Sequence, residues 1–182
     1  EPVLCFVMIG TEKPAEVYVE NKTISFKGNK AEPGVYKIEG SPSHKDFADF
    51  IAVFVPLAQQ LSSQAGVINN TMPGTTRDSM MNIYTGTQQK LQAEIDKLVA
   101  KKPTSVIAPF VLNVTYQFND DIMLLEKRYN MLDVAMHNTE AGKQLQDFIN
   151  QNKVGAIGTA AMDFTQPDTT GLPISLSSFK GK

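Results

Sequence analysis

Few residues of this chain have the types and spacing that chemistry requires, and the first of them is a single cysteine. Cys5 lies within the apolar run of residues 3–9. Thiol-disulfide exchange needs a second thiol to resolve the mixed disulfide, and one thiol cannot close a disulfide within the chain. We therefore predict that Cys5 is a small buried residue of a strand, with no catalytic role.

Two histidines and one pair of carboxylates are the other candidates. His44 and His137 are far apart in the sequence, and neither has a Cys or Glu at the spacing of a zinc site. Asp120 and Asp121 are adjacent, so on a helix they would not face each other, and Asp is favoured at helix N-termini. We predict that they cap a helix. The sequence thus predicts no catalytic residue, no cofactor-binding residue and no metal ligand.

Composition limits the kinds of protein that this chain can be. Its 182 residues are 42% hydrophobic, which is enough for a buried core in one domain or two small ones. The 17 basic and 19 acidic residues are spread along the chain, and this excludes a nucleic-acid footprint. No apolar run reaches the roughly 18 residues of a membrane-spanning helix, so we expect no membrane span.

The first part of the chain, residues 1–40, has the pattern of short strands. Apolar, β-branched and aromatic residues gather in four runs, at residues 3–9, 17–19, 23–26 and 35–39. Turn-forming residues separate these runs, at 10–14, 20–22, 28–30 and 33–34. The alternation of short runs and turns predicts a small antiparallel β meander.

From Gly40 onward the apolar residues recur at three- and four-residue steps, which predicts a helical bundle over residues 41–153. Ser41 or Ser43 caps a first helix that runs to about residue 65 and contains Pro56, where we expect a kink. A second helix over 77–101 should pack against it as an antiparallel hairpin. Two further helices are predicted over 120–132 and 139–152. Residues 105–117 remain open, because their β-branched residues favour a strand and their apolar spacing favours a helix.

The predicted helices end at a glycine-containing linker. Gly155 and Gly158 loosen residues 154–159, which we predict to connect the bundle to the last segment. This stretch is also the nearest approach to a phosphate-binding loop, but it lacks the lysine and the third glycine of such loops.

The last segment, residues 162–182, reads Met-Asp-Phe-Thr-Gln-Pro-Asp-Thr-Thr-Gly-Leu-Pro-Ile-Ser-Leu-Ser-Ser-Phe-Lys-Gly-Lys. It resembles the opening segment of the TlpA/ResA-like thioredoxin-fold thiol-disulfide oxidoreductases, Phe-x-x-x-Asp-x-x-Gly-x-Pro-x-Ser-Leu-Ser-x-Phe-Lys-Gly-Lys. In that family a central strand and a Trp-Cys-x-x-Cys turn follow at once. The resemblance implies that this segment is the first β-hairpin of a thioredoxin-like domain and that the reactive cysteines lie beyond Lys182.

A second resemblance covers earlier parts of the chain. Residues 16–41 are similar to the end of a β domain of unknown function that precedes thioredoxin modules in Bacteroidetes-type lipoproteins, which implies that the β domain here is partial. Lys22 replaces the turn glycine of that domain and Asn29 replaces its aspartate. Residues 102–112 are similar to the Asn-Pro-x-Ser helix start of the same proteins. The resemblance therefore favours a helix for residues 105–117.

Together these patterns predict an α+β protein with a β meander over 1–40, a helical bundle over 41–153, and a linker with the start of an incomplete thioredoxin-like domain over 154–182. The resemblance implies a non-catalytic N-terminal region of an extracytoplasmic thiol-disulfide oxidoreductase, periplasmic or an outer-membrane lipoprotein, with a role in cell redox homeostasis. The region would position the redox domain or recognise its protein partner, and it would need no cofactor. The alternative is a free-standing extracytoplasmic binding module. We also expect a homodimer through the last segment, because unpaired edge strands favour association.

Overall fold

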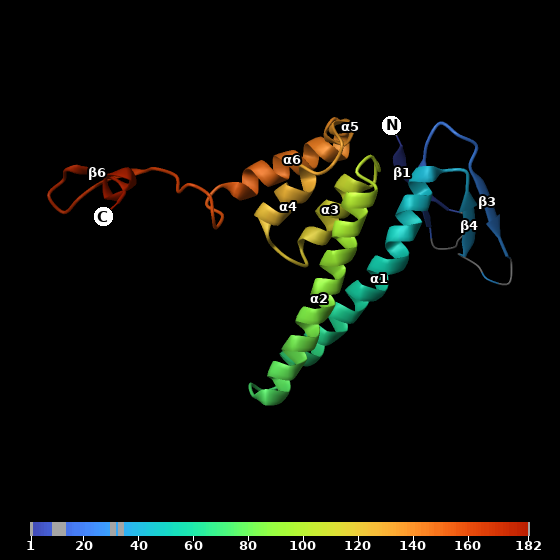
Figure 1. Ribbon diagram of the computed structural model, residues 1–182, viewed down its shortest axis with the longest axis horizontal. Helices are drawn as coiled ribbons and strands as arrows, with labels where there is room; N and C mark the ends of the chain where they lie inside the picture. Colours follow the sequence, from blue (N-terminus) through green and yellow to red (C-terminus); the bar gives the residue numbers. More distant parts are fainter. Residues whose placement is uncertain (1, 9–13, 30–31, 33–34, 182) are drawn as a thin grey trace.

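The structure, a computed structural model, describes residues 2–8, 14–29, 32 and 35–181. In chain order it has two short strand pairs, a helical region and a final strand pair (Figure 1). The α+β class and the order of its parts, which the sequence predicts, are confirmed. The β part, the helices and the last strand pair follow one another across Figure 1 from right to left.

The four N-terminal strands form two antiparallel pairs. β1 (Val3–Val7) pairs with β2 (Ala15–Val19), and β3 (Ser25–Gly28) pairs with β4 (Tyr36–Glu39). A continuous meander would also pair β2 with β3, but among the described residues the two pairs are separate sheets. The strands lie within two residues of their predicted positions. The turn predicted at 10–14 lies outside the described residues except for Pro14, and so do Lys30 of the turn predicted at 28–30 and the whole turn predicted at 33–34.

The chain enters the helical region at Gly40, the position where a glycine is required. Gly40 has a φ of 102°, and a Cβ atom there would lie 2.1 Å from the carbonyl oxygen of Thr23. The next residue, Ser41, caps α1 (Pro42–Asn69), since its Oγ accepts a hydrogen bond from the backbone N–H of His44 at 3.0 Å. The predicted cap at Ser41 is confirmed.

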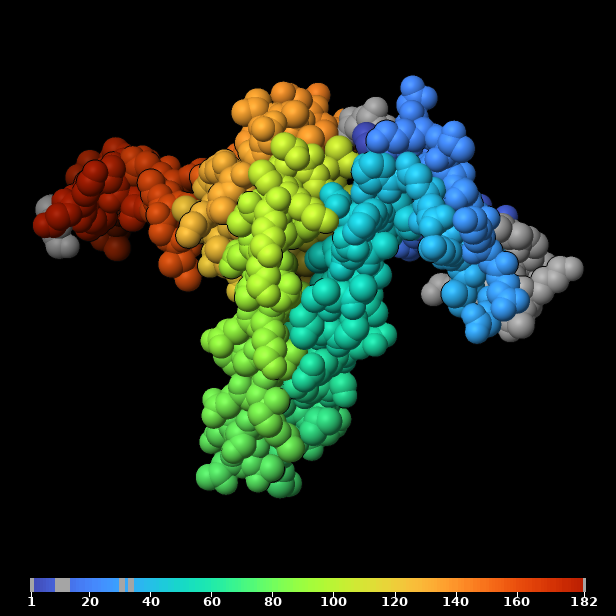
Figure 2. All heavy atoms as spheres, turned by 45° about the vertical axis from the view of Figure 1, so that its right-hand side comes forward, coloured from blue at the N-terminus to red at the C-terminus, as the bar shows by residue number. Residues whose placement is uncertain are grey.

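The two longest helices form the hairpin that the sequence predicts. α1 continues through Pro56 to Asn69, four residues beyond its predicted end, and α2 (Thr75–Lys101) returns beside it (Figure 1). The bundle covers only the part of the hairpin that holds the start of α1 and the end of α2. The remainder protrudes on its own, as Figure 2 also shows.

Four shorter helices complete the bundle: α3 (Ala108–Tyr116), α4 (Ile122–Tyr129), α5 (Val134–His137) and α6 (Glu140–Lys153). Residues 108–116 are therefore helical, as the apolar spacing and the resemblance favoured. α4 and α6 confirm the helices predicted over 120–132 and 139–152, although α4 ends three residues early. The single turn α5 was not predicted.

Two apolar clusters hold these elements together. The larger joins buried residues of α1, α2, α3, α4 and α6, among them Leu61, Ile95 and Ile149. The smaller joins Tyr18 of β2 to Phe47 and Phe50 of α1 and to α3, so it fastens the first strand pair to the bundle. Full burial of one such side chain stabilises the fold by about 1.5–3 kcal/mol.

α1 is the one helix in the described part of the chain that is long and apolar enough to cross a bilayer, judged by length and composition alone. A core helix of a folded protein can meet the same criteria; α1 buries Phe47, Phe50 and Leu61 in the two clusters, while 11% of its most apolar 18-residue window is buried. The finding is compatible with the expectation that the chain has no membrane span.

Beyond α6 the chain packs Ala156 against the larger cluster and then leaves the bundle. Residues 154–164 lead to β5 (Thr165–Pro167), which pairs antiparallel with β6 (Pro173–Ser175), and the 3-10 helix η1 (Leu176–Phe179) follows. The strand pair predicted for the last segment is thus present. It projects away from the helices at the end of a thin connection (Figure 1).

Candidate functional site

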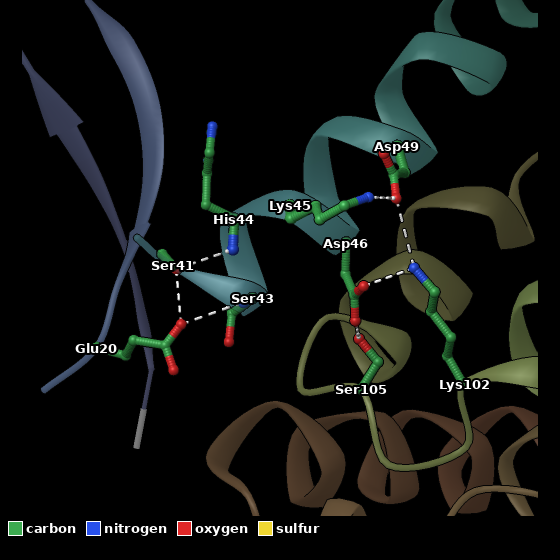
Figure 3. A network of polar contacts seen from close by, with 9 residues as sticks. All are labelled: Glu20, Ser41, Ser43, His44, Lys45, Asp46, Asp49, Lys102 and Ser105. Carbon is green, nitrogen blue, oxygen red and sulfur yellow. Dashed lines mark hydrogen bonds and ion pairs between the residues drawn. The ribbon is translucent and has the colours of Figure 1, made fainter. Parts of the chain in front are cut away.

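A network of polar contacts surrounds the first turns of α1, and its first part binds the strands to the helix (Figure 3). Glu20 follows β2 directly, and its Oε1 accepts hydrogen bonds from Ser41 Oγ at 2.7 Å and from the backbone N–H of Ser43 at 3.1 Å. A carboxylate at the positive N-terminal end of a helix stabilises that end. Glu20 therefore joins the end of β2 to the start of α1.

The second part of the network binds α1 to the end of α2. Asp46 accepts from Lys102 Nζ and from Ser105 Oγ, both at 2.6 Å, through its two carboxylate oxygens. Asp49, one turn later, accepts from Lys45 at 2.8 Å and lies 3.5 Å from Lys102 (Figure 3). Asp46 thus bridges α1, the C-terminal cap of α2 and the loop that leads to α3.

The charges of this network are fixed by their partners. The hydrogen bond from Ser41 lowers the pKa of Glu20, and the hydrogen bond from Lys45 lowers the pKa of Asp49. The hydrogen bond to Asp46 raises the pKa of Lys102. These shifts move each group further from neutral pH, so none of the three is suited to exchange a proton there. The network is suited to hold elements together.

The two histidines lie in different surroundings. Burial lowers the pKa of His44, whose ring centroid is 6.3 Å from that of Phe47, and its Nδ1 atom is buried without a hydrogen-bond partner among the described residues. His137 stacks on Tyr129 with centroids 4.3 Å apart, and its Nε2 lies 2.9 Å from the Tyr129 carbonyl oxygen. In the part of the chain that the structure describes, no three His, Cys, Asp or Glu side chains form a group that could hold a metal.

The remaining candidate residues have structural positions. Cys5 lies in β1 opposite Val17 and is half-buried. It is less buried than predicted, because among the described strands β1 pairs with β2 alone. The Asp121 carboxylate accepts from the N–H groups of Met123 and Leu124 at 3.0 and 2.9 Å, so its predicted role as a cap is confirmed. Asp120 precedes it with a φ of 52°.

The final hairpin is held by polar contacts of its own. Asp168 forms the turn: its Oδ1 accepts from the N–H and hydroxyl of Thr170, both at 2.7 Å, and from the N–H of Leu172 at 2.9 Å. Asp163 accepts from the N–H and hydroxyl of Ser177 at 2.8 and 2.7 Å, which ties η1 to the chain before β5. These hydrogen bonds lower the pKa of both carboxyls. The segment therefore has a defined shape without help from the bundle.

The same hairpin exposes a set of large apolar side chains. They are Phe164, Leu172, Ile174, Leu176 and Phe179. Several of them surround a shallow hollow of about 250 Å³ between the strands and η1. No residue of the hairpin is buried. A concentration of apolar surface on so small an element is typical of a surface that another protein part covers.

A second hollow lies between the start of α1 and the end of α2. This groove has a volume of about 210 Å³ and an apolar floor that includes Phe50, Val53 and Leu91. Charged side chains of both signs, among them Asp49 and Lys101, surround it. No local pattern in the sequence indicates this groove, because the groove depends on how the two helices are offset when they pack.

Residues of the opening-segment motif lie where the hairpin needs them. Asp168 organises the turn, Gly171 has a φ of 84°, and Phe164 and Phe179 lie on the exposed apolar side. Comparison of the chain with models of protein families, with curated proteins and with solved structures finds no match. The family therefore remains a prediction that rests on these residues.

Proposed function

We propose that the chain is the non-catalytic N-terminal region of an extracytoplasmic thiol-disulfide oxidoreductase, in which the last hairpin belongs to a thioredoxin-like redox domain. One observation supports this most strongly. The hairpin is shaped by its own hydrogen bonds, yet its large apolar side chains remain 37–64% exposed. Such a segment is suited to dock against a further domain, because little conformational freedom is lost when it does.

The connection between the bundle and the hairpin supports a positioning role. Residues 154–164 contain Gly155, which has a φ of 78°, and Gly158, which has a φ of 89°. At roughly 3.3 Å per residue the connection spans at most about 36 Å. A domain held on so short a connection stays at an effective concentration in the millimolar range beside the bundle. The bundle would therefore present the redox domain to its protein partner or recognise that partner itself.

The chemistry of the proposed function has to come from outside the described chain. The one thiol is Cys5 in β1, and it has no second thiol to resolve a mixed disulfide. In the proposed arrangement the following domain supplies both thiols, and the strands and helices of this chain make no contact with the reacting sulfurs. We propose an extracytoplasmic location, periplasmic or as an outer-membrane lipoprotein, on the same resemblance.

The codons that follow Lys182 in the gene test this proposal. It predicts an aliphatic strand directly after Lys182 and then a Trp-Cys-x-x-Cys sequence. A stop codon, or a following domain without paired cysteines, would refute the redox role.

The groove between α1 and α2 favours a second candidate function, that of a free-standing extracytoplasmic binding module. Its apolar floor and charged edges are typical of sites for small ligands or peptide side chains, although about 210 Å³ is small for such a site. The same gene sequence separates the two candidates, because a binding module requires no dithiol domain.

A further inference from the structure

His44 lies at the joint between the first strand pair and the helices. Its backbone N–H donates to the Ser41 cap, which places the residue in the first turn of α1. Its ring lies against that of Phe47, with centroids 6.3 Å apart. The Phe47 ring in turn meets Tyr18 of β2 at 5.3 Å and Phe110 of α3 at 6.1 Å. His44 therefore borders the smaller apolar cluster, which fastens β1 and β2 to the bundle.

The surroundings of the His44 ring favour its neutral form. The Nδ1 atom is buried without a hydrogen-bond partner among the described residues, whereas a protonated imidazole is a donor at both of its nitrogens. A proton would also add a positive charge to the first turn of α1, where the helix dipole is already positive. Burial lowers the pKa of His44, and no charged group among the described residues contributes to that shift. Protonation of the ring therefore costs free energy as long as the joint is closed.

The charged groups around the first turns of α1 have partners of their own. In Figure 3 the His44 side chain points away from the carboxylates of Glu20 and Asp46. Each of these carboxylates accepts two hydrogen bonds from other residues. Lys45 and Asp49 form an ion pair with each other at 2.8 Å. None of these groups is therefore a free acceptor for a proton on His44.

The elements that pack near this end of α1 do not supply a counter-charge either. The ionisable residues of the strands and of α3 are Cys5 of β1, Glu16 and Tyr18 of β2, Tyr36, Lys37 and Glu39 of β4, and Tyr116 of α3. Cysteine and tyrosine side chains are uncharged in mild acid. Glu39 is paired with two lysines, and Glu16 is exposed, where salt and water screen its charge. Lys101 and Lys102 at the end of α2 are themselves cations. Among the described residues, no group is thus placed to stabilise the protonated ring.

From this arrangement we infer that His44 is a pH-sensitive switch: its neutral form keeps the first strand pair against the bundle, and its protonation in mild acid releases that pair while the helices stay folded. The stabilisation of the joint is complete above pH 6.5 and is lost as the pH falls from 6.5 toward the lower pKa of the closed state. Glu20 acts in a separate range, because its carboxylate stays ionised until the pH falls below 4.5. His137 differs from His44, since its Nε2 already has the Tyr129 carbonyl oxygen at 2.9 Å, an acceptor that also suits a protonated ring.

Hydrogen exchange of the 182-residue chain, measured by mass spectrometry at about pH 7.5 and about pH 5 and corrected for intrinsic exchange, tests the switch. A two-stranded hairpin alone is marginally stable in water, so the amides of β1 and β2 lose protection once the pair is released. Their protection should fall by about three- to thirtyfold, where the upper value corresponds to about 1.5 pH units below 6.5. Protection of α2 and α6 should change by less than about twofold, because the larger cluster stays closed.

Substitution of each histidine assigns the effect to one residue. His44→Gln and His44→Phe cannot take up a proton, so each should abolish the fall in protection, and the second keeps an aromatic ring beside Phe47 if the first does not fold. His137→Gln is the matched control, because it removes the other histidine of the chain and should leave the fall unchanged. Proton NMR of the unchanged protein should show one histidine C2 proton that titrates below pH 6.5 and is missing in His44→Gln.

Four outcomes would overturn the inference. They are equal protection of β1 and β2 at the two pH values, a fall that persists in the His44 variants, a His44 signal that titrates at or above pH 6.5, and an equal fall in α2 and α6, which would mean that the whole protein opens. The switch does not depend on the proposed redox role, because every measurement uses the strands and helices of this chain alone. Either proposal can therefore fail while the other stands.

Discussion

Removal of the Asp46 carboxylate should destabilise the protein far more than removal of Asp49, although both face Lys102 from the same helix. In Asp46→Ala the Ser105 hydroxyl, in a residue only 7% exposed, loses its acceptor. An unpaired buried hydroxyl costs about 1–3 kcal/mol. The ion pair with Lys102 adds about 0.5–1 kcal/mol, a small value because the Lys102 side chain is 38% exposed. Together the two contributions amount to about 1.5–4 kcal/mol, and we expect a loss near the middle of that range, about 2–3 kcal/mol.

Asp49→Ala is the matched control. The Asp49 side chain is 52% exposed and its ion pair with Lys45 lies in solvent, so its loss should cost about 0.5 kcal/mol or less. Alanine has a higher intrinsic helix propensity than aspartate by about the same amount at both positions, so this gain in helix stability cancels when the two variants are compared. Urea unfolding measures both free energies, and the melting temperature of Asp46→Ala should fall by about 4–12 °C. Equal losses for the two variants would refute the role of Asp46 as a bridge between α1 and α2.

Three further predictions concern other parts of the molecule. The pKa of Glu20 is lowered from 4.5 in the folded protein, so the ionised carboxylate stabilises the fold above that pH, and this stabilisation is lost as the pH falls through the pKa of the folded protein. In Glu20→Gln the free energy of unfolding, measured with urea, should therefore fall less on acidification than in the unchanged protein. Asp96→Ala should lower the free energy of unfolding by about 2–3 kcal/mol, because it leaves the Arg128 guanidinium, which is 7% exposed, without its carboxylate. Arg128→Met removes the buried charge itself and should lower the free energy of unfolding by only about 1–2 kcal/mol. A larger loss for Arg128→Met in thermal unfolding would contradict this prediction. The chain should not reduce insulin, and turnover that persists in Cys5→Ser would contradict that prediction.

Local signals in the sequence predict much of the fold. The caps at Ser41 and Asp121 and the apolar spacing within α1 and α2 each depend on residues a few positions apart. The turn at Asp168 is local in the same sense. Features of this kind are visible in a sequence because the residues that form them are close together in it.

Features that depend on distant residues were not predicted. Arg128 reads as a basic residue in the last turn of α4, yet it is buried and bonds to Gln92 and Asp96 of α2, more than thirty residues away. The bridge from Asp46 to Lys102 likewise joins residues from different helices. Only the packed structure shows these contacts.

The most direct test of the proposed function is whether the apolar side of the last hairpin is covered when the encoded continuation is present. Hydrogen exchange measured by mass spectrometry on residues 162–179 can compare the 182-residue chain with the longer polypeptide read from the gene. We predict fast exchange in the first and strong protection in the second, because β5 and β6 become part of a packed domain. Equally fast exchange in both would contradict the account.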